Sequence, residues 1–416
     1  MGERGRLARY LSGAAVARVG DELSGPALLL TGLAWTGSAA SGSALLAGLT
    51  ASAAVGGPLF GALLDRSARP GRLLAVALAL YGCGLVVVLL SLSRVPLPCV
   101  VAVAVVAGLL GPALTGGWTS QLPRVAGRWL SRANAWDAMT FQLATLVGPG
   151  LAGLVAGVAG ASAGVVVAVV LLGVAVPLAW SLPSAVPSVG VGDGGGVGVP
   201  LPLRAPHRPS LRRELGEGFR AIGRSRPLWR ATVMTAVSHV GLGVLVSVVP
   251  LLGLAVWGRA DRGPFLLVAA SVGALAVGAA LSRWPGVWGP EALLCRGTAL
   301  MGLACGLAAM GWVPGLWCAG VLLGVGEGAQ LTALFAVRHR EAPERLRGQI
   351  FTTGASVKVS GFALGVAVGG PLGGWSPWGA LWCAAGAQGV ALLCGPSVRA
   401  LSGDRSGADS RVGWGS

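Results

Sequence analysis

Several ionisable side chains lie inside long apolar stretches of this sequence. They are Arg18, Asp21, Glu22, His239, Glu327 and Lys358. An ionisable group deep in a bilayer is costly, and such groups mostly pair with one another, bind a substrate or carry protons. The pattern therefore indicates movement of a solute or of protons through a membrane, and these residues are the candidate coupling and substrate-binding residues.

The three charges of the first apolar stretch are close in sequence. Arg18 and Asp21 are three residues apart and share a helix face, so we expect an ion pair with a structural role or a role in binding protons or substrate. Asp21 and Glu22 are adjacent and project about 100° apart on a helix. Only one of them can point squarely at a central cavity, and we favour Asp21 because Arg18 can hold it charged.

The later stretches carry one charge each. Glu327 and Lys358 are expected at similar depths in neighbouring helices, where they can form a structural pair or take part in coupling. His239 is interpreted first as a hydrogen-bonded packing residue, with proton relay as the alternative. The sequence contains no Ser/His/Asp set, no metal-ligand cluster and no phosphate-binding loop. We therefore expect no cofactor, no metal and no enzymatic activity.

The composition requires a lipid environment. Of 416 residues, 54% are hydrophobic and 11% are charged, and the mean hydropathy is +0.74. A soluble domain carries about 25% charged residues. The apolar runs are roughly 18–28 residues long, enough for a helix to cross a bilayer. The net charge of +16 does not indicate a nucleic-acid partner, because the basic residues lie in the gaps between apolar runs.

The runs predict an all-α membrane protein with twelve transmembrane helices in two sets of six. The helices are expected at about 10–35, 42–64, 73–93, 97–120, 135–158, 161–182, 229–257, 264–283, 291–312, 314–337, 349–373 and 376–396. The predicted domains are an N-terminal bundle (1–182), a linker with an amphipathic surface helix (183–228), a C-terminal bundle (229–396) and a disordered cytoplasmic tail (397–416).

The distribution of basic residues predicts the orientation. Of the 31 lysines and arginines, nearly all lie at the termini, in the central linker or in the loops on one side of the predicted bundle. The loops on the other side hold Arg94, Arg259 and Arg262. Loops rich in Lys and Arg stay in the cytoplasm. We therefore expect a multi-pass protein of the inner or plasma membrane with both termini in the cytoplasm.

The two sets of helices have matching segments. Gly61–Arg66 after the second helix corresponds to Gly278–Arg283 after the eighth. Gly148–Gly153 in the fifth helix corresponds to Gly369–Gly374 in the eleventh. Duplicated halves are typical of secondary transporters, whose binding site lies between the halves.

These features resemble the major facilitator superfamily over nearly the whole chain. Gly61, Asp65, Arg66 and Arg69 match the GxxxDRxGR motif of that family, with Ala68 in place of its second glycine. The resemblance implies that Asp65 contacts the start of the eleventh helix and locks the outward-open form. A carboxylate is favourable at a helix N-terminus. The alternative is a loop that only marks the topology.

The fifth helix also resembles members of this family. Gly148, Pro149 and Gly153 match the antiporter motif GPxxGG, with Ala152 in place of one glycine. In the family this motif is associated with export. The segment from Arg18 to Asp21 is similar to the first helix of prokaryotic drug and siderophore exporters. The fourth helix lacks the arginine that the family carries there.

The resemblance implies that helices one, four, seven and ten line a central cavity. We expect a secondary active transporter for proton-coupled efflux of a small amphipathic drug or metabolite by alternating access. The alternatives are an importer or facilitator of a small solute and, in another class, a non-transporting sensor or membrane enzyme. The expected partners are a small-molecule substrate, protons and the bilayer; we expect a monomer.

Overall fold

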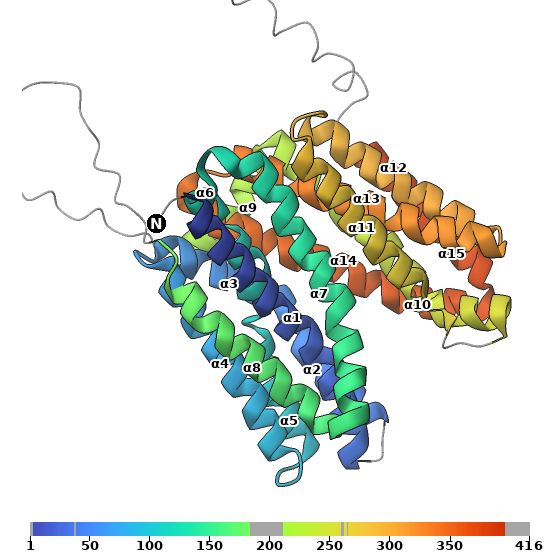
Figure 1. The fold of residues 1–416 in the computed structure, drawn as a ribbon, viewed down its shortest axis with the longest axis horizontal. Coiled ribbons are helices and arrows are strands. Elements are labelled where there is room, and N and C mark those ends of the chain that lie inside the picture. Colours follow the sequence, from blue (N-terminus) through green and yellow to red (C-terminus); the bar gives the residue numbers. More distant parts are fainter. Residues whose placement is uncertain (1–2, 37–38, 184–210, 259–261, 264, 396–416) are drawn as a thin grey trace, which may run out of the picture.

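The computed structural model describes residues 3–36, 39–183, 211–258, 262–263 and 265–395. Most of the predicted linker and the predicted C-terminal tail lie outside these residues. All regular secondary structure in the described chain is helical. Ten segments of it are long and apolar enough to span a membrane, and α1 and α15 pack beside them. The predicted fold of twelve long helices in two halves is confirmed (Figure 1).

The N-terminal half contains α1 to α8. Its elements are α1 (Glu3–Thr36), α2 (Ala39–Ala51), α3 (Ala53–Arg66), α4 (Pro70–Ser91), α5 (Leu97–Gly108), the π-helix η1 (Ala113–Gly117), α6 (Leu122–Ala126), the 3-10 helix η2 (Gly127–Trp129), α7 (Leu130–Ala159) and α8 (Ala161–Trp180). The second predicted helix is divided into α2 and α3. The fourth consists of α5 and η1, and the fifth begins earlier than expected, at Leu130.

The C-terminal half contains α10 to α15 and is preceded by a short helix. Its elements are α9 (Leu211–Arg224), α10 (Arg226–Trp257), α11 (Phe265–Arg283), α12 (Pro290–Ala309), α13 (Val313–Glu341), the 3-10 helix η4 (Glu344–Leu346), α14 (Arg347–Trp375) and α15 (Pro377–Cys394). Ser225 and Ser376 cap α10 and α15 by accepting hydrogen bonds from the N–H groups of Leu228 and Gly379.

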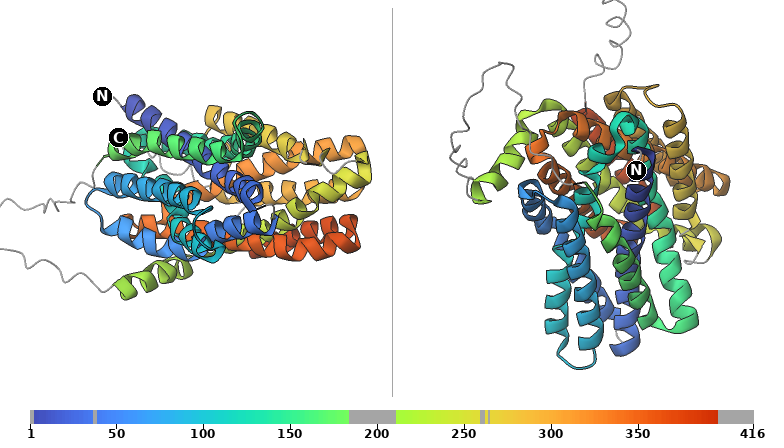
Figure 2. Two further views of the ribbon diagram at one scale, coloured as in Figure 1. Left: turned by 90° about the horizontal axis from the view of Figure 1, so that it is seen from below. Right: turned by 60° about the vertical axis from the view of Figure 1, so that its left-hand side comes forward.

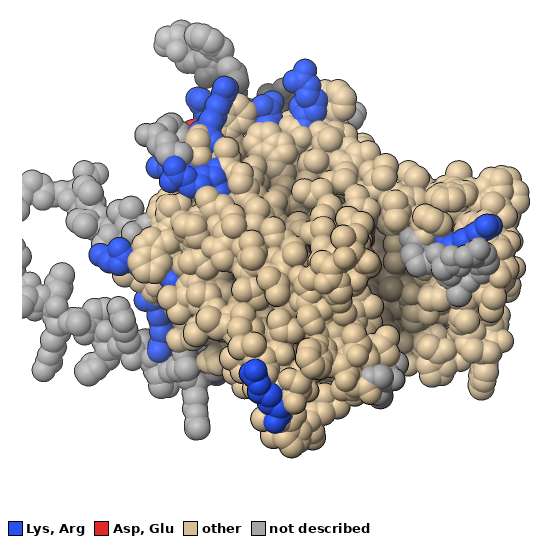
Figure 3. All heavy atoms as spheres, turned by 60° about the horizontal axis from the view of Figure 1, so that its bottom comes forward, with Lys and Arg blue, Asp and Glu red and all other residues tan. Residues whose placement is uncertain are grey.

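The two halves diverge from one end of the molecule. In Figure 1 both bundles meet where α3, α6 and α9 lie, and their other ends point in different directions. Figure 2 shows the same arrangement from two further sides. The space-filling view shows a hollow between the two bodies (Figure 3). We call the end where the halves meet the closed end; arginines gather there.

Small residues allow the halves to approach at the closed end. A Cβ atom at Gly57 or Gly61 of α3 would collide with Thr352 of α14. At the α7–α11 contact, a Cβ atom at Gly278 would collide with the side chain of Met139. These contacts tie the halves together through two helix pairs, α3–α14 and α7–α11.

An apolar cluster fills the space between these helix pairs. We call it the aromatic plug; it consists of Ala138, Phe141, Leu331, Phe335 and Phe351. The ring centroids of Phe141 and Phe335 are 5.7 Å apart, and those of Phe335 and Phe351 are 6.1 Å apart. The plug joins α7 of one half to α13 and α14 of the other.

The short helix α9 packs on the closed end. It contacts α3, α10 and α14, and Ile222 is buried in these contacts. Glu217 forms a 2.9 Å ion pair with Arg345, which precedes α14. Phe219 is 52% exposed. A helix thus occupies this part of the predicted linker, and one of its faces covers the junction between the halves.

Candidate functional site

The first candidate site is the contact of Asp65 with α14. The two carboxylate oxygens of Asp65 accept hydrogen bonds from the backbone N–H groups of Gly348, at 2.6 Å, and Gln349, at 2.8 Å. The residue that precedes α14, Leu346, offers no side-chain cap. Asp65 therefore caps a helix of the other half, where the free N–H groups and the helix dipole favour a carboxylate.

The neighbours of Asp65 explain part of the predicted motif. Gly61 lies one turn earlier on the same face of α3, and a Cβ atom there would collide with the backbone of α14. Arg124 and Arg347 lie within electrostatic range of the Asp65 carboxylate. No sequence pattern predicts this proximity. Arg66 ends α3 and is half-buried, whereas Arg69 is exposed just before α4.

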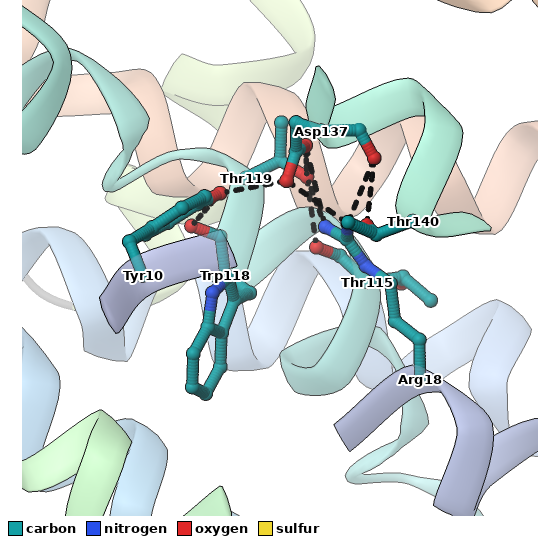
Figure 4. Close-up of polar contacts among 7 residues, drawn as sticks. All are labelled: Tyr10, Arg18, Thr115, Trp118, Thr119, Asp137 and Thr140. Carbon is teal, nitrogen blue, oxygen red and sulfur yellow. Dashed lines mark hydrogen bonds and ion pairs between the residues drawn. The ribbon is translucent and has the colours of Figure 1, made fainter. Parts of the chain in front are cut away.

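The second feature is a buried ion pair around Arg18 (Figure 4). Nη1 of Arg18 donates to Oδ1 of Asp137 at 2.9 Å, and the side chains are 1% and 0% exposed. Tyr10 and Thr119 also donate to the Asp137 carboxylate, at 3.0 and 2.9 Å. The Arg18 guanidinium lies 3.6 Å from the ring centroid of Phe141 in the plug. This network ties α1 to α7 beside the plug.

The expected pairing of Arg18 with Asp21 is therefore wrong. Asp21 instead accepts a 2.9 Å hydrogen bond from the Tyr81 hydroxyl of α4. Tyr81 also shares a 2.8 Å hydrogen bond with Ser24. Although Asp21 and Arg18 are one turn apart on α1, the ion-pair partner of Arg18 is the buried carboxylate of Asp137 on the facing helix α7. Asp21 points into the N-terminal bundle.

Glu22 is exposed and faces the other half. Its carboxylate lies within electrostatic range of Glu327 on α13 and Lys358 on α14. Glu327 and Lys358 are half-buried and also lie within electrostatic range of each other. We call these three residues the central charged site. The preference for Asp21 as the cavity-facing acid of α1 was wrong, because the adjacent Glu22 is the one directed toward the other half.

The central charged site lies on the open side of the plug. Phe351 precedes Lys358 by seven residues on α14, which is about 10 Å along the helix axis. Among the described residues, Glu22, Glu327 and Lys358 form no ion pair within 4.0 Å. Glu327 and Lys358 thus make no direct ion pair; they and Glu22 of the other half lie within electrostatic range of one another, and coupling between Glu327 and Lys358 stays a prediction.

The predicted motif of the fifth helix lies on α7 and contacts α1 at Glu22. A Cβ atom at Gly148 would come within 2.7 Å of the Glu22 Cβ and 2.9 Å of its carbonyl carbon. Gly148 thus lets α7 pass directly against the backbone of α1 at the charged residue. Pro149 lies inside α7 and is exposed, and a Cβ atom at Gly153 would meet nothing within 4 Å. Of this motif, Gly148 has the contact that bears on the site.

His239 lies near the central charged site but forms a local contact. Its Nδ1 is 2.8 Å from the carbonyl oxygen of Thr235, one turn earlier on α10. Its Nε2 has no hydrogen-bond partner among the described residues. Lys358 and Arg338 are within electrostatic range of the ring. Both the packing and the relay interpretations of His239 therefore stay open.

Asp137 and Arg338 are buried charges that the sequence analysis missed. Asp137 lies two residues after the predicted start of its helix, but the helix begins at Leu130, so Asp137 is deep in the bundle. Arg338 follows an apolar run, which predicts a position in a loop, but it is buried inside α13. In both cases the helix extends beyond its apolar run, so the hydropathy pattern does not show that the charged residue is buried.

Comparisons with known proteins agree with this architecture. The family model of the major facilitator superfamily matches residues 10–366. No curated protein sequence matches the chain. The structure of the human organic anion transporter MFSD10 has a TM-score of 0.74 and 17% identity, covering 95% of this chain and 99% of that one.

Two further solved structures share the fold. A bacterial homologue of the iron transporter ferroportin, in an outward-facing state, has a TM-score of 0.71 and 15% identity, covering 94% of this chain and 98% of that one. The proton:xylose symporter XylE has a TM-score of 0.65 and 13% identity, covering 93% and 95%. At such identities the likeness concerns the fold alone. With the family model matched over most of its length, the chain belongs to the major facilitator superfamily of membrane transporters.

Proposed function

We propose that the protein is a proton-coupled exporter of small amphipathic cations that works by alternating access. The observation that carries this proposal is the central charged site, in which two carboxylates and one ammonium group from both halves lie within electrostatic range of one another. Arg338 also lies within electrostatic range of Lys358, and Asp21 within range of Glu22. When all five groups are ionised, one negative charge is left unbalanced. A proton or a cationic substrate would neutralise it, and the two would compete for the same carboxylate.

The orientation that we propose places the closed end in the cytoplasm. The arginine-rich loops at this end support it, since such loops stay inside. The hollow then opens to the outside, and the protein is in an outward-open state. In this state a proton from outside binds Glu22 after substrate has left.

The return to the inward-facing state requires the closed end to separate. The two hydrogen bonds between Asp65 and α14 must break, and the aromatic plug must part. Neutralising the central charged site lowers the cost of enclosing it between the halves, because an unbalanced charge is expensive in a low-dielectric space. This links proton binding to the conformational change and supports exchange of a proton for a cation.

The proposal is tested with purified protein in proteoliposomes that are acidic inside. They should accumulate ethidium, a permanently charged amphipathic cation, and release protons as they do so. Nigericin, which dissipates the pH gradient, should abolish the accumulation, and protein-free liposomes are the control. Accumulation that persists with nigericin would indicate a facilitator. Protons moving in the same direction as the substrate would indicate a symporter, and no transport of any amphipathic cation in a panel would contradict the substrate class.

A further inference from the structure

Three arginines surround one tryptophan at the closed end. The guanidinium carbons of Arg4, Arg128 and Arg132 lie 5.3, 5.6 and 5.2 Å from the ring centroid of Trp129. Arg4 is on α1, Arg128 is in η2 and Arg132 is on α7. Arginines from three different segments therefore converge on one point of the surface.

The charge of this cluster is largely unbalanced. Glu3 approaches Arg128 at 3.8 Å, but both side chains are well exposed, so the pair is weak. Arg4 and Arg132 have no ion-pair partner among the described residues. The cluster thus presents a net positive charge, and arginine is suited to bind a phosphate through paired N–H donors.

An apolar cavity opens directly beside the arginines. Its volume is about 540 Å³, and it lies between α1 and α7. Its lining residues are Arg4, Leu7, Ala8, Leu11, Trp129, Trp136, Met139 and Thr140. Arg4 and Trp129 belong to both the cluster and the cavity. A ligand that fits both must have an anionic head joined to a hydrocarbon chain.

We propose that this is a binding site for an anionic phospholipid. The phosphate contacts Arg4, Arg128 and Arg132, and an acyl chain enters the cavity along Leu7 and Leu11. The position fits a lipid, because tryptophan and arginine at the end of a membrane helix lie at the level of the headgroups.

The site is connected to the closed end through two of its lining residues. The Thr140 hydroxyl contacts Arg18 and donates to the carbonyl oxygen of Asp137 at 2.7 Å. The Met139 side chain packs against Gly278 of the other half. A bound lipid therefore bridges α1 and α7 beside the Arg18–Asp137 pair and stabilises the N-terminal half.

A second apolar cavity in the other half offers a control. It has a volume of about 820 Å³ and lies among α11, α12 and α13. Its lining includes a single arginine, Arg296, which lies 4.7 Å from the ring centroid of Trp288. This cavity is larger but lacks a cluster of arginines, so it should not select an anionic headgroup.

The test measures the melting temperature of the full-length protein in neutral detergent with added lipid. Phosphatidylglycerol should raise it, whereas phosphatidylcholine and inorganic phosphate should not. The gain should be lost in the double variant Arg4→Gln/Arg132→Gln and in Ala8→Phe, which fills the cavity and keeps the charges. It should be retained in Arg296→Gln.

Several outcomes would overturn the proposal. An equal rise with phosphatidylcholine would mean that the headgroup charge is not recognised. An equal rise with inorganic phosphate would mean that an anion alone binds there. A gain that survives in Arg4→Gln/Arg132→Gln and in Ala8→Phe would place the lipid elsewhere. Because the comparison of lipids uses the unaltered protein, the proposal stays testable even if a variant fails to fold.

Discussion

At the scale of single residues, the N-terminal half contains charges that are satisfied by local partners and one exposed charge, Glu22, to which we assign coupling. Arg18 and Asp137 satisfy each other in the interior, and Asp21 is held by Tyr81. Glu22 is exposed and interacts electrostatically with charges of the other half. Adjacent residues on one helix thus have different surroundings because they project in different directions.

The buried pair gives a prediction on stability. Asp137→Asn leaves the Arg18 guanidinium without a counter-charge and should lower the free energy of unfolding by ~3–5 kcal/mol. Asp21→Asn is the matched control; it alters one hydrogen bond and should cost about 1 kcal/mol. Thermal unfolding in detergent measures both. If the two variants melt at the same temperature, the Arg18–Asp137 ion pair contributes no more to stability than the hydrogen bond of Asp21.

At the scale of helices, two close contacts position the proposed machinery. Gly61 and Asp65 bring α3 onto the start of α14, and Gly148 brings α7 onto α1 at Glu22. Each contact depends on a glycine because a side chain would occupy the space of the facing backbone. The close packing of these helix pairs therefore determines which charged side chains lie near each other.

The α1–α7 contact can be tested by a pair of glycine substitutions. Gly148→Leu should force the helices apart and destabilise the protein by about 1–3 kcal/mol, with loss of transport. Gly153→Leu, on the same helix with open space around it, should change stability by less than about 0.5 kcal/mol. Melting temperature and ethidium accumulation are the measurements. Equal effects at the two positions would show that the contact at Glu22 is not specific.

The Asp65 cap gives a prediction on transport rate. Asp65→Asn keeps a hydrogen-bond acceptor but removes the charge that interacts with the α14 dipole, Arg124 and Arg347, at a cost of about 0.3–1 kcal/mol. The closed end should become less stable, and transport should slow although the protein inserts normally. Arg94→Gln, at an exposed position outside the motif, is the control. Normal insertion with an unchanged rate would exclude a gating role for Asp65.

At the scale of the whole molecule, the halves enclose a hollow that is sealed at one end. This arrangement predicts unequal accessibility on α14. In a cysteine-free background, Lys358→Cys should react with a membrane-impermeant thiol reagent added outside intact cells, whereas Thr352→Cys, buried at the α3 contact, should not. Reaction of both at the same rate would contradict a seal between them, and reaction of Lys358→Cys only from the inside would reverse the proposed orientation.

The sequence predicted the fold well because apolar runs and arginine-rich gaps are direct consequences of lipid as a solvent. It also identified Asp65, Glu22, Glu327 and Lys358 as candidate residues. It failed where side-chain direction decided the partner: Asp21 was preferred to Glu22, and Arg18 was given a partner on its own helix. Asp137 was missed because its helix begins one turn before the apolar run. The partner of a charged side chain depends on which helices face each other. The hydropathy pattern contains no information about that.

The central claim is that Glu22 couples protons to transport. The most direct test is substrate-driven proton movement in proteoliposomes, measured for the unaltered protein, Glu22→Gln and Asp21→Asn. The claim predicts that Glu22→Gln reduces proton movement by about tenfold or more, corresponding to at least ~1.4 kcal/mol, while Asp21→Asn retains it. Proton movement at the unaltered rate in Glu22→Gln, or its loss only in Asp21→Asn, would contradict the claim.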